Sequence, residues 1–556
     1  MSDQSLFDEN RELSGDDILA QATKVKVFER EATGLVRELT PLDVALLNFA
    51  ILGFLFTLFF TVAIIPLIGG NYLIGFLLTG GLSLSLLYTY YSFHLAMPRS
   101  GGDYVFLSRT LSPALGFVGN ASFILVLLVY TGITGVTIQT TGFAIGFALL
   151  GSLLHSSSIS GMSGFFDTRT ASLILGTIEI LGLSLPAIFG RRAYFRLQNV
   201  IYIIVFIAAI IMILLFLTST NAAFQSAFNS YSASYANTPN YYQKVMTQAQ
   251  ANGWSAPSQS SLYGTLLLVP IISIFGTSFI SSTYVGGEIR RPSKSSLQGM
   301  MIAMIFAFIL AAIFIGALYN TVGFNFLSAL DFQAASGTLA IPVTPYANFL
   351  ALLLTHNSII IGFVIIAGIL QMAIYIPGYY YMASRSLLAY SFDGILPKRV
   401  SSVHPKYHTP VVAIIIIAVL SEISLILLNI PYTSAKIYLF STVLTWYDAI
   451  FPMMLVGIAG IIFPFRKKDL FESSPAKSRI AGIPVMSITG IITVIFTGMI
   501  AYLELTNSVY AANTSLGIEF VVGSVVVLFA IYFVAKVVRK HQGQPLDLVF
   551  GEIPPE

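Results

Sequence analysis

The chain has 556 residues, of which 56% are hydrophobic and only 10% are charged, and its mean hydropathy is +0.82. Soluble chains carry about 25% charged residues, so this composition excludes an ordinary soluble domain and predicts a polytopic membrane protein. The net charge of +3 says little by itself, and the lack of cysteine excludes disulfides, thiolate metal sites and cysteine catalysis.

The first 40 residues are polar, carry charges of both signs and do not resemble a cleaved signal peptide. We expect a cytoplasmic N-terminal arm over 1–40. Thr40, Pro41 and Asp43 then predict the start of a helix, because a threonine cap, a proline in the first turn and an early acid all favour the helix N-terminus.

Twelve apolar runs follow, each long enough to cross a bilayer at roughly 20 residues per span. They cover 43–66, 71–96, 113–148, 169–189, 195–219, 262–287, 296–322, 347–384, 410–430, 435–463, 485–505 and 514–537. The third and eighth runs exceed the bilayer thickness, so we expect them to tilt or to extend beyond the membrane.

The positions of Lys and Arg orient these runs, because basic residues concentrate in cytoplasmic segments. If the N-terminus lies inside and the runs alternate, every Lys and Arg except Arg169, Lys244 and Lys436 falls on the inner side or in its flanks. This split supports twelve spans with both termini in the cytoplasm. The polar segment 220–261 is then an extracellular loop, which either covers a gate or is simply solvated.

The sixth run is interrupted by residues that a simple membrane helix avoids. Pro270 removes a backbone donor, and Ser273, Gly276, Thr277 and Ser278 place small or polar groups near mid-membrane depth. Lipid cannot bond the backbone groups freed at such a break, and two half-helices meeting there point their dipole ends at one spot. The pattern favours a site for a small charged or zwitterionic solute. The alternative is a proline-kinked helix that only packs.

Four segments, in order along about 40–540, resemble the amino acid–polyamine–organocation (APC) permeases. They are MPRSGGDY at 97–104, EIRRP at 288–292, SFDGILPKRVSSVHPKYHTP at 391–410 and FPFRKKDLF at 463–471. The resemblance implies an all-α membrane protein with 12 transmembrane helices in the leucine-transporter arrangement, a 5+5 inverted repeat plus two extra helices. It divides the chain into a first repeat over 41–219, the loop 220–261, a second repeat over 262–463, two further helices with their preceding cytoplasmic loop over 464–538, and a cytoplasmic tail over 539–556.

The resemblance also implies a second break, in the first run, where a single glycine stands in place of the family's richer glycine pattern. Amides around Ile51 to Gly53 would hold a substrate carboxylate, and carbonyls of 273–276 would accept from its ammonium group. The implied substrate-binding residues are Asn48, Ala50, Ile51, Leu52, Gly53, Ser273, Ile274, Phe275, Gly276, Thr277 and Ser278. Asn48 has a second interpretation, a bond between helices. Ile280 stands where the family often has an acid, which argues against a cationic substrate.

Placing a charged side chain at the bilayer centre costs about 3 kcal/mol, so each ionisable residue inside an apolar run is a candidate for a functional or structural role. Asp448 is the leading candidate for a proton carrier or gate, and Glu179 is a second coupling candidate; a hydrogen-bonded structural acid is the alternative for both. Glu422 is expected to be structural, and Glu519 to reach the outer interface.

Arg99 and Arg109 with Asp103 are expected to form a cytoplasmic gate network with Glu288 or Asp393, unless they only set the topology. The six histidines form no ligand cluster, so no metal and no cofactor are expected. No G-x-x-x-x-G-K-[ST] motif is present, so ATP-driven transport is unsupported. The sodium site that the resemblance implies would use hydroxyls of the eighth run, but residues 371–381 contain no Ser/Thr pair, which favours protons or exchange.

The sequence therefore predicts a secondary transporter for amino acids, not an enzyme, that works by alternating access in the cell membrane. Its expected partners are an amino acid, protons and the lipid bilayer, with no nucleic acid. The alternatives are a transporter of the same fold for amines, polyamines or nucleobases, and, in a different class, a channel or a membrane enzyme. The residues leave open which amino acid is carried, the coupling ion, the direction and the oligomeric state.

Overall fold

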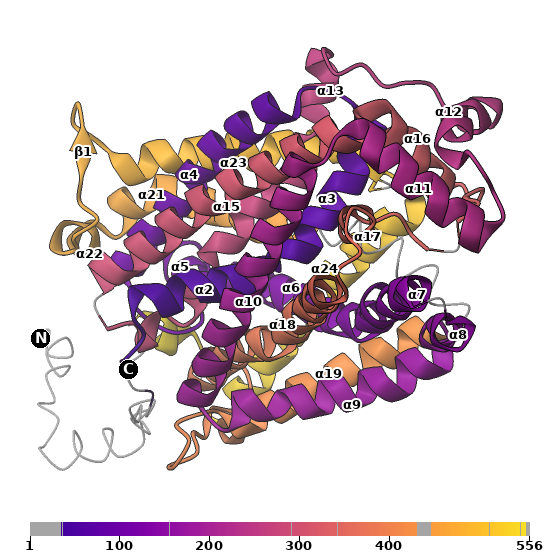
Figure 1. The fold of residues 1–556 in the computed structure, drawn as a ribbon. Helices are drawn as coiled ribbons and strands as arrows, with labels where there is room; N and C mark the ends of the chain where they lie inside the picture. Colours follow the sequence, from indigo (N-terminus) through magenta and orange to yellow (C-terminus); the bar gives the residue numbers. More distant parts are fainter. Residues whose placement is uncertain are drawn as a thin grey trace, which may run out of the picture.

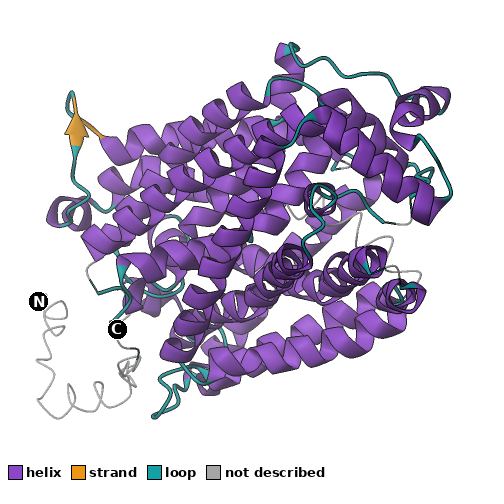
Figure 2. Ribbon diagram, in the orientation of Figure 1, coloured by secondary structure: helices purple, strands orange, loops and turns teal. Residues whose placement is uncertain are grey.

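The computed structural model describes residues 35, 37–154, 156–290, 292–341, 343–430, 446–510, 512–544 and 546–551. Within these ranges the chain is helical almost throughout, and the small antiparallel hairpin of β1 (Arg479–Ile480) and β2 (Ile483–Pro484) is its only sheet (Figure 2).

The first half of the chain forms α2 (Pro41–Leu52), α3 (Phe54–Ile68), α4 (Tyr72–Ala96), α5 (Asp103–Thr110), α6 (Pro113–Thr137), the π-helix η1 (Ile138–Phe143), α7 (Ala144–Leu153), α8 (Ser157–Phe166), α9 (Arg169–Ile188), α10 (Arg191–Thr218), α11 (Asn221–Ala236), α12 (Tyr241–Ala251), α13 (Leu262–Leu267), α14 (Val269–Thr277) and the 3₁₀ helices η2 (Ser278–Tyr284) and η3 (Gly286–Glu288).

The second half forms α15 (Pro292–Val322), α16 (Phe324–Ala335), α17 (Ala347–Leu352), α18 (Ser358–Phe392), η4 (Lys398–Ser401), α19 (Val411–Asn429), the π-helix η5 (Trp446–Ile450), α21 (Phe451–Arg466), α22 (Lys468–Ser473), α23 (Val485–Thr506), η6 (Ser508–Tyr510), α24 (Ser515–His541) and η7 (Leu546–Gly551).

In the described part of the chain, ten helices are long and apolar enough to cross a membrane, and the bent pair α2 and α3 makes an eleventh when counted as one span. The prediction of an all-α, multi-pass membrane protein is confirmed. Most helix bounds match the apolar runs closely, since hydropathy alone sets them. The tenth run is described only from Trp446 onward, as η5 and α21, because 431–445 lie outside the described residues.

The eighth run differs from its prediction. The stretch expected as one helix over 347–384 is divided into α17 and α18, because a polar stretch separates them and Asn357 caps α18 by accepting from the amides of Ile359 and Ile360 at 2.9 and 3.3 Å. α18 then continues to Phe392, eight residues past the expected end.

The predicted helix start at Thr40 is confirmed as a capping box. The Asp43 amide donates to the Thr40 hydroxyl oxygen at 3.3 Å, and the Thr40 amide donates to the Asp43 carboxylate at 3.0 Å. Pro41 occupies the first turn, where its missing N–H costs nothing.

The helices form one bundle with different structures at its two ends (Figure 1). One end carries α11, α12 and α16 and is called the α16 end; the opposite end carries α5, α22 and the β-hairpin and is called the α5 end. In the interior, α2 packs against η2, α10, α15 and α18. α24 is peripheral, because few of its residues are buried.

Candidate functional site

The first run is broken at Gly53, between α2 and α3, where the helix axis bends by 41°. Gly53 has φ of +57°, a left-handed conformation that favours glycine. A Cβ atom at this position would lie 1.4 Å from the hydroxyl oxygen of Tyr375 on α18. Two features therefore require glycine at this position: the left-handed backbone and the close contact with Tyr375.

Side chains of α18 and of α3 itself bond the backbone groups exposed at this break. The Leu52 carbonyl accepts from the hydroxyls of Tyr375, at 2.9 Å, and Thr57. The Phe56 amide donates to Oε1 of Gln371 at 2.9 Å. Since lipid could bond none of these groups, α18 takes the place of water at the break.

The sixth run is interrupted at Leu268, between α13 and α14, and is α-helical again over Val269–Thr277. α14 continues through Thr277, and the helix tightens to 3₁₀ geometry only from Ser278 to Tyr284. The hydroxyls of Ser273 and Ser278 donate to carbonyls three and four residues earlier, Pro270 at 2.7 Å and Ile274 at 2.9 Å. These local bonds keep the polar residues inside the helix, so the irregular stretch lies about one turn closer to the α5 end than the sequence suggested.

The two irregular stretches touch through Asn48. Its Oδ1 accepts from the Ser282 amide at 2.9 Å, and its Nδ2 donates to the Ser282 hydroxyl at 3.4 Å. The side chain therefore joins α2 to η2, which is the second interpretation given for it above.

Aromatic rings fill most of the space around the two stretches. The Phe49 ring lies 5.0 Å from Phe206 and 5.3 Å from Phe279, and Phe275 lies 5.6 Å from Phe76. The remaining members of the predicted substrate-binding set, Ala50, Ile51, Gly276 and Thr277, are buried, while Ile274 is half-buried. The structure thus brings 48–53 and 273–282 together, but it fills the contact between them with side chains.

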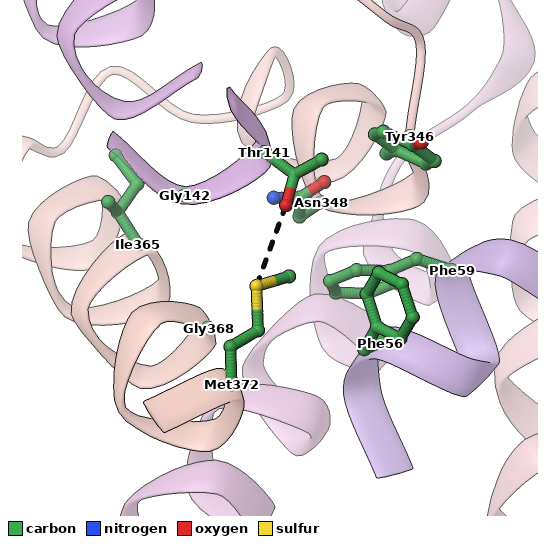
Figure 3. A pocket seen from close by; sticks show the side chains of 9 residues that line it. All are labelled: Phe56, Phe59, Thr141, Gly142, Tyr346, Asn348, Ile365, Gly368 and Met372. Carbon is green, nitrogen blue, oxygen red and sulfur yellow. Dashed lines mark hydrogen bonds between the residues drawn. The ribbon is translucent and has the colours of Figure 1, made fainter. Parts of the chain in front are cut away.

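A small pocket, with enclosed room for about one water molecule, lies between α3, η1, α17 and α18 (Figure 3). Its lining is largely apolar and consists of Phe56, Phe59, Thr141, Gly142, Tyr346, Asn348, Ile365, Gly368 and Met372. None of these residues was predicted from the sequence. The available signal was weak: the threonines and glycine at 140–142 interrupt an apolar run, and here they form a π-helix, a feature frequent at functional sites.

The polar atoms at this pocket are few. The Thr141 hydroxyl donates to the Thr137 carbonyl at 2.6 Å and contacts the Met372 sulfur at 3.5 Å (Figure 3). Oδ1 of Asn348 is buried with no hydrogen-bond partner among the described residues. Nε2 of Gln371, the residue before Met372, is also buried and has no hydrogen-bond partner among the described residues.

A buried ion pair joins η3 to α18 at the α5 end. Nε of Arg385 donates to Glu288 at 2.8 Å, and the two side chains are 0% and 3% exposed. Tyr381 donates to the other carboxylate oxygen, and the guanidinium lies 3.6 Å from the centre of its ring. Sequence reasoning selected Glu288 but not Arg385 as its partner, because that pairing depends on how α18 packs.

A second buried pair joins α5 to the end of α18. Arg109 donates to both oxygens of Asp393, at 2.6 and 2.8 Å, and Tyr104 donates to the same carboxylate at 2.6 Å. The C-terminal η7 covers this pair, with the Phe550 ring centre 5.0 Å from the Arg109 guanidinium carbon. The structure therefore pairs Arg109 with Asp393, one of the two acids that the sequence offered.

Asp103 accepts from uncharged donors. They are the hydroxyls of Tyr284, at 3.0 Å, and Tyr90, at 3.3 Å, and the amide of Asn120. Burial raises the pKa of Asp103 to about 6, although these hydrogen bonds favour the charged form. Arg99 donates to the Pro98 carbonyl at 3.3 Å.

The acids inside the spans take separate positions. Glu179 on α9 accepts from Nε2 of Gln139, in η1, at 2.8 Å, and Glu422 accepts from Thr177. Glu519 is exposed. Asp448 falls in η5, but its side chain lies outside the described residues.

The comparisons with known proteins agree with this architecture. The family model described as "Amino acid permease" matches residues 44–547. The branched-chain amino acid permease BcaP of Bacillus subtilis (strain 168) is 23% identical over 457 residues, which cover 81% of this chain and 85% of that protein. A permease family implies a transporter rather than an enzyme. Because the family match extends over most of the chain, this protein belongs to the amino acid permease family of the APC superfamily.

Proposed function

We propose that this amino acid transporter is a secondary active permease that works by alternating access in the cell membrane. The observation that carries the proposal is the break at Gly53, whose backbone groups are bonded by side chains in the interior of the bundle. Solute sites in transporters form at such discontinuous helices.

The proposed arrangement has 12 helices, with the α5 end in the cytoplasm. Inverted repeats over 41–219 and 262–463 are supported by the positions of two breaks, since the first helix of each proposed repeat is interrupted. The basic loops of the α5 end support its cytoplasmic location. In this state the two buried ion pairs close the α5 end, while the pocket marks the path toward the α16 end.

The substrate that best fits is an amino acid with an aliphatic side chain. The small pocket beside α3 is lined largely by apolar side chains, Phe56, Phe59, Ile365 and Met372 among them, and no charged residue lines it. The name of the Bacillus subtilis relative points the same way. The predicted substrate-binding residues of 48–53 and 273–278 remain the proposed site, with amides around Ile51 to Gly53 for the substrate carboxylate and carbonyls of 273–276 for its ammonium group.

Coupling to protons or exchange is favoured over sodium at the first break. A sodium site there would use backbone carbonyls, but the Leu52 carbonyl already accepts from two hydroxyls, which occupy both of its lone pairs. Asp448 and Glu179 remain the candidates for a proton carrier.

The proposal is tested with purified protein in liposomes, by uptake of labelled leucine, isoleucine and valine with and without an imposed pH gradient. We expect saturable uptake, and accumulation driven by the gradient if protons are coupled. Isoamylamine, which lacks the carboxylate, separates this function from amine transport: if it is carried and leucine is not, the amine alternative replaces the proposal. If neither is carried, a transporter of this substrate class is excluded.

A further inference from the structure

The α18 helix reaches the break at Gly53 with two side chains one turn apart. Gln371 and Tyr375 are spaced i, i+4, so they leave the same face of the helix. On one side of the break, the Tyr375 hydroxyl donates to the Leu52 carbonyl at 2.9 Å. On the other side, Oε1 of Gln371 accepts from the Phe56 amide at 2.9 Å. One face of α18 therefore holds the chain both before and after Gly53.

The bond from Tyr375 is not needed to satisfy the Leu52 carbonyl. The hydroxyl of Thr57, on α3 itself, donates to the same oxygen. One hydrogen bond is enough for a buried carbonyl to count as satisfied. The second donor comes from a different helix, so what it adds is a fixed position of this carbonyl relative to α18.

The close approach of α18 depends on the glycine at the break. A Cβ atom at Gly53 would lie 1.4 Å from the Tyr375 hydroxyl oxygen, so this hydroxyl occupies the place of the absent side chain. Gln371 is 0% exposed and Tyr375 is 6% exposed, so bulk water does not compete for either bond. Both connections are therefore built into the packed interior.

Together the two bonds fix the shape of the break. Leu52 is the last residue of α2, and Phe56 lies in the first turn of α3. An α-helix places residues i and i+4 about 6 Å apart along its axis, so α18 sets the spacing between the two attachment points. The bend of 41° between α2 and α3 is thereby fixed, and with it the direction of the backbone groups beside Gly53.

We propose that Gln371 and Tyr375 are positioning residues for the substrate carboxylate. They do not touch the substrate, but they hold the amides beside Gly53 in the orientation that binds the carboxylate. The inference rests on the proposed function, which places the carboxylate at these amides, and deepens it by assigning the geometry of that site to α18. Because only the carboxylate end of the substrate meets the first break, loss of either bond should weaken recognition of that end alone.

The test measures the Kd of the purified protein for leucine and for leucinamide, which lacks the carboxylate. In Tyr375→Phe the Kd for leucine should rise about 3- to 10-fold, the net worth of one hydrogen bond, while the Kd for leucinamide stays within about twofold. Gln371→Met keeps the length of the side chain but leaves the Phe56 amide without its acceptor. It should lower the preference for leucine over leucinamide at least as much.

Two controls separate positioning from a general loss of stability. Thr57→Val removes the other bond to the Leu52 carbonyl but leaves the connection to α18 in place, so it should keep the wild-type preference for leucine. Tyr380→Phe removes a buried hydroxyl of α18 that donates to a carbonyl of α9 at 3.4 Å, and it should bind both ligands as the wild type does. If Thr57→Val lowers the preference as much as Tyr375→Phe, the connection to α18 is not the cause and the inference is wrong.

The inference is overturned if either Tyr375→Phe or Gln371→Met folds and keeps the wild-type preference for leucine over leucinamide. If neither variant folds, 3-fluorotyrosine in place of Tyr375 keeps the hydroxyl and provides a second test. Its fluorine-19 resonance should shift at saturating leucine but not at saturating leucinamide; equal shifts, or no shift with leucine, overturn the inference. If the wild type binds no amino acid at all, the proposed function fails instead, which is a distinguishable outcome.

Discussion

Glu288→Gln should open the α5 end of the transporter. The substitution removes the charge that neutralises Arg385, while the size of the side chain hardly changes. Both partners are almost fully buried, and breaking such a pair by removing one partner costs about 3–5 kcal/mol, because an uncompensated charge remains inside. Glutamine can still accept one hydrogen bond, so we expect the lower limit, about 3 kcal/mol.

This cost falls on the closed state alone. When the α5 end opens, Arg385 becomes hydrated and no longer needs its partner. A penalty of about 3 kcal/mol on one of two states shifts their ratio roughly 100-fold toward the other, at 1.4 kcal/mol for each factor of ten. The double variant Glu288→Gln/Arg385→Gln removes both charges and should restore part of the closed population.

The shift is measured by labelling a single cysteine in a chain that has none of its own. Ser281→Cys places a thiol in η2, at a position that is fully buried in the closed state. A membrane-impermeant maleimide added at the α5 end should react up to about 100-fold faster in the Glu288→Gln background.

Glu472→Gln is the control, because its pair with Arg479 is about 40% exposed on both sides and such pairs are worth at most about 1 kcal/mol. An unchanged labelling rate in Glu288→Gln, or an equal rise in Glu472→Gln, would refute the reasoning.

Three further predictions concern the break at Gly53, the buried acid Asp103 and the C-terminal tail. Gly53→Ala should destabilise the protein by about 2–4 kcal/mol and lower its thermal midpoint, because it adds left-handed backbone strain and displaces Tyr375. Asp103 should make stability fall as the pH rises from about 4 to 6, since its pKa is raised from an unfolded value of about 3.9; the protonated form is favoured in the fold, and the full effect is about 3 kcal/mol. Asp103→Asn should flatten the thermal midpoint over this range. Phe550→Ala should speed proteolysis of the C-terminal tail, since it removes a cation–π contact worth about 0.5–2 kcal/mol.

Each of these has a control and a contradicting outcome. Gly161→Ala adds a Cβ that meets nothing within 4 Å, so an equal loss in Gly53→Ala and Gly161→Ala would show that the contact with Tyr375 is not the cause. A pH profile that survives in Asp103→Asn would assign the titration to another group. An unchanged cleavage rate in Phe550→Ala would mean that the ring does not hold the tail.

The sequence predicts the membrane helices well because each depends only on local hydropathy. The bounds expected for the fourth and eleventh runs differ from α9 and α23 by a single residue at one end. The cap at Thr40 was also visible, since a threonine before a proline has a local meaning, whereas the break in the first run was expected from the resemblance to the family.

What the sequence could not predict depends on pairs that are distant along the chain. Asn48 meets Ser282 across 234 positions, and Arg385 meets Glu288 across 97. The pocket combines residues from α3, η1, α17 and α18, which no run of the sequence brings together. The irregular part of the sixth run was expected about one turn away from where it lies. A serine in an apolar run looks the same in the sequence whether its hydroxyl binds a ligand or a carbonyl of its own helix, as those of Ser273 and Ser278 do.

The most direct test of the account is counterflow: liposomes preloaded with unlabelled leucine and containing the purified protein are mixed with a trace of labelled leucine. A carrier with one site open to each side in turn should produce a transient accumulation of label inside, which saturates and is suppressed by isoleucine. Uptake that never exceeds simple equilibration, or that equals the uptake of empty liposomes, would contradict the account.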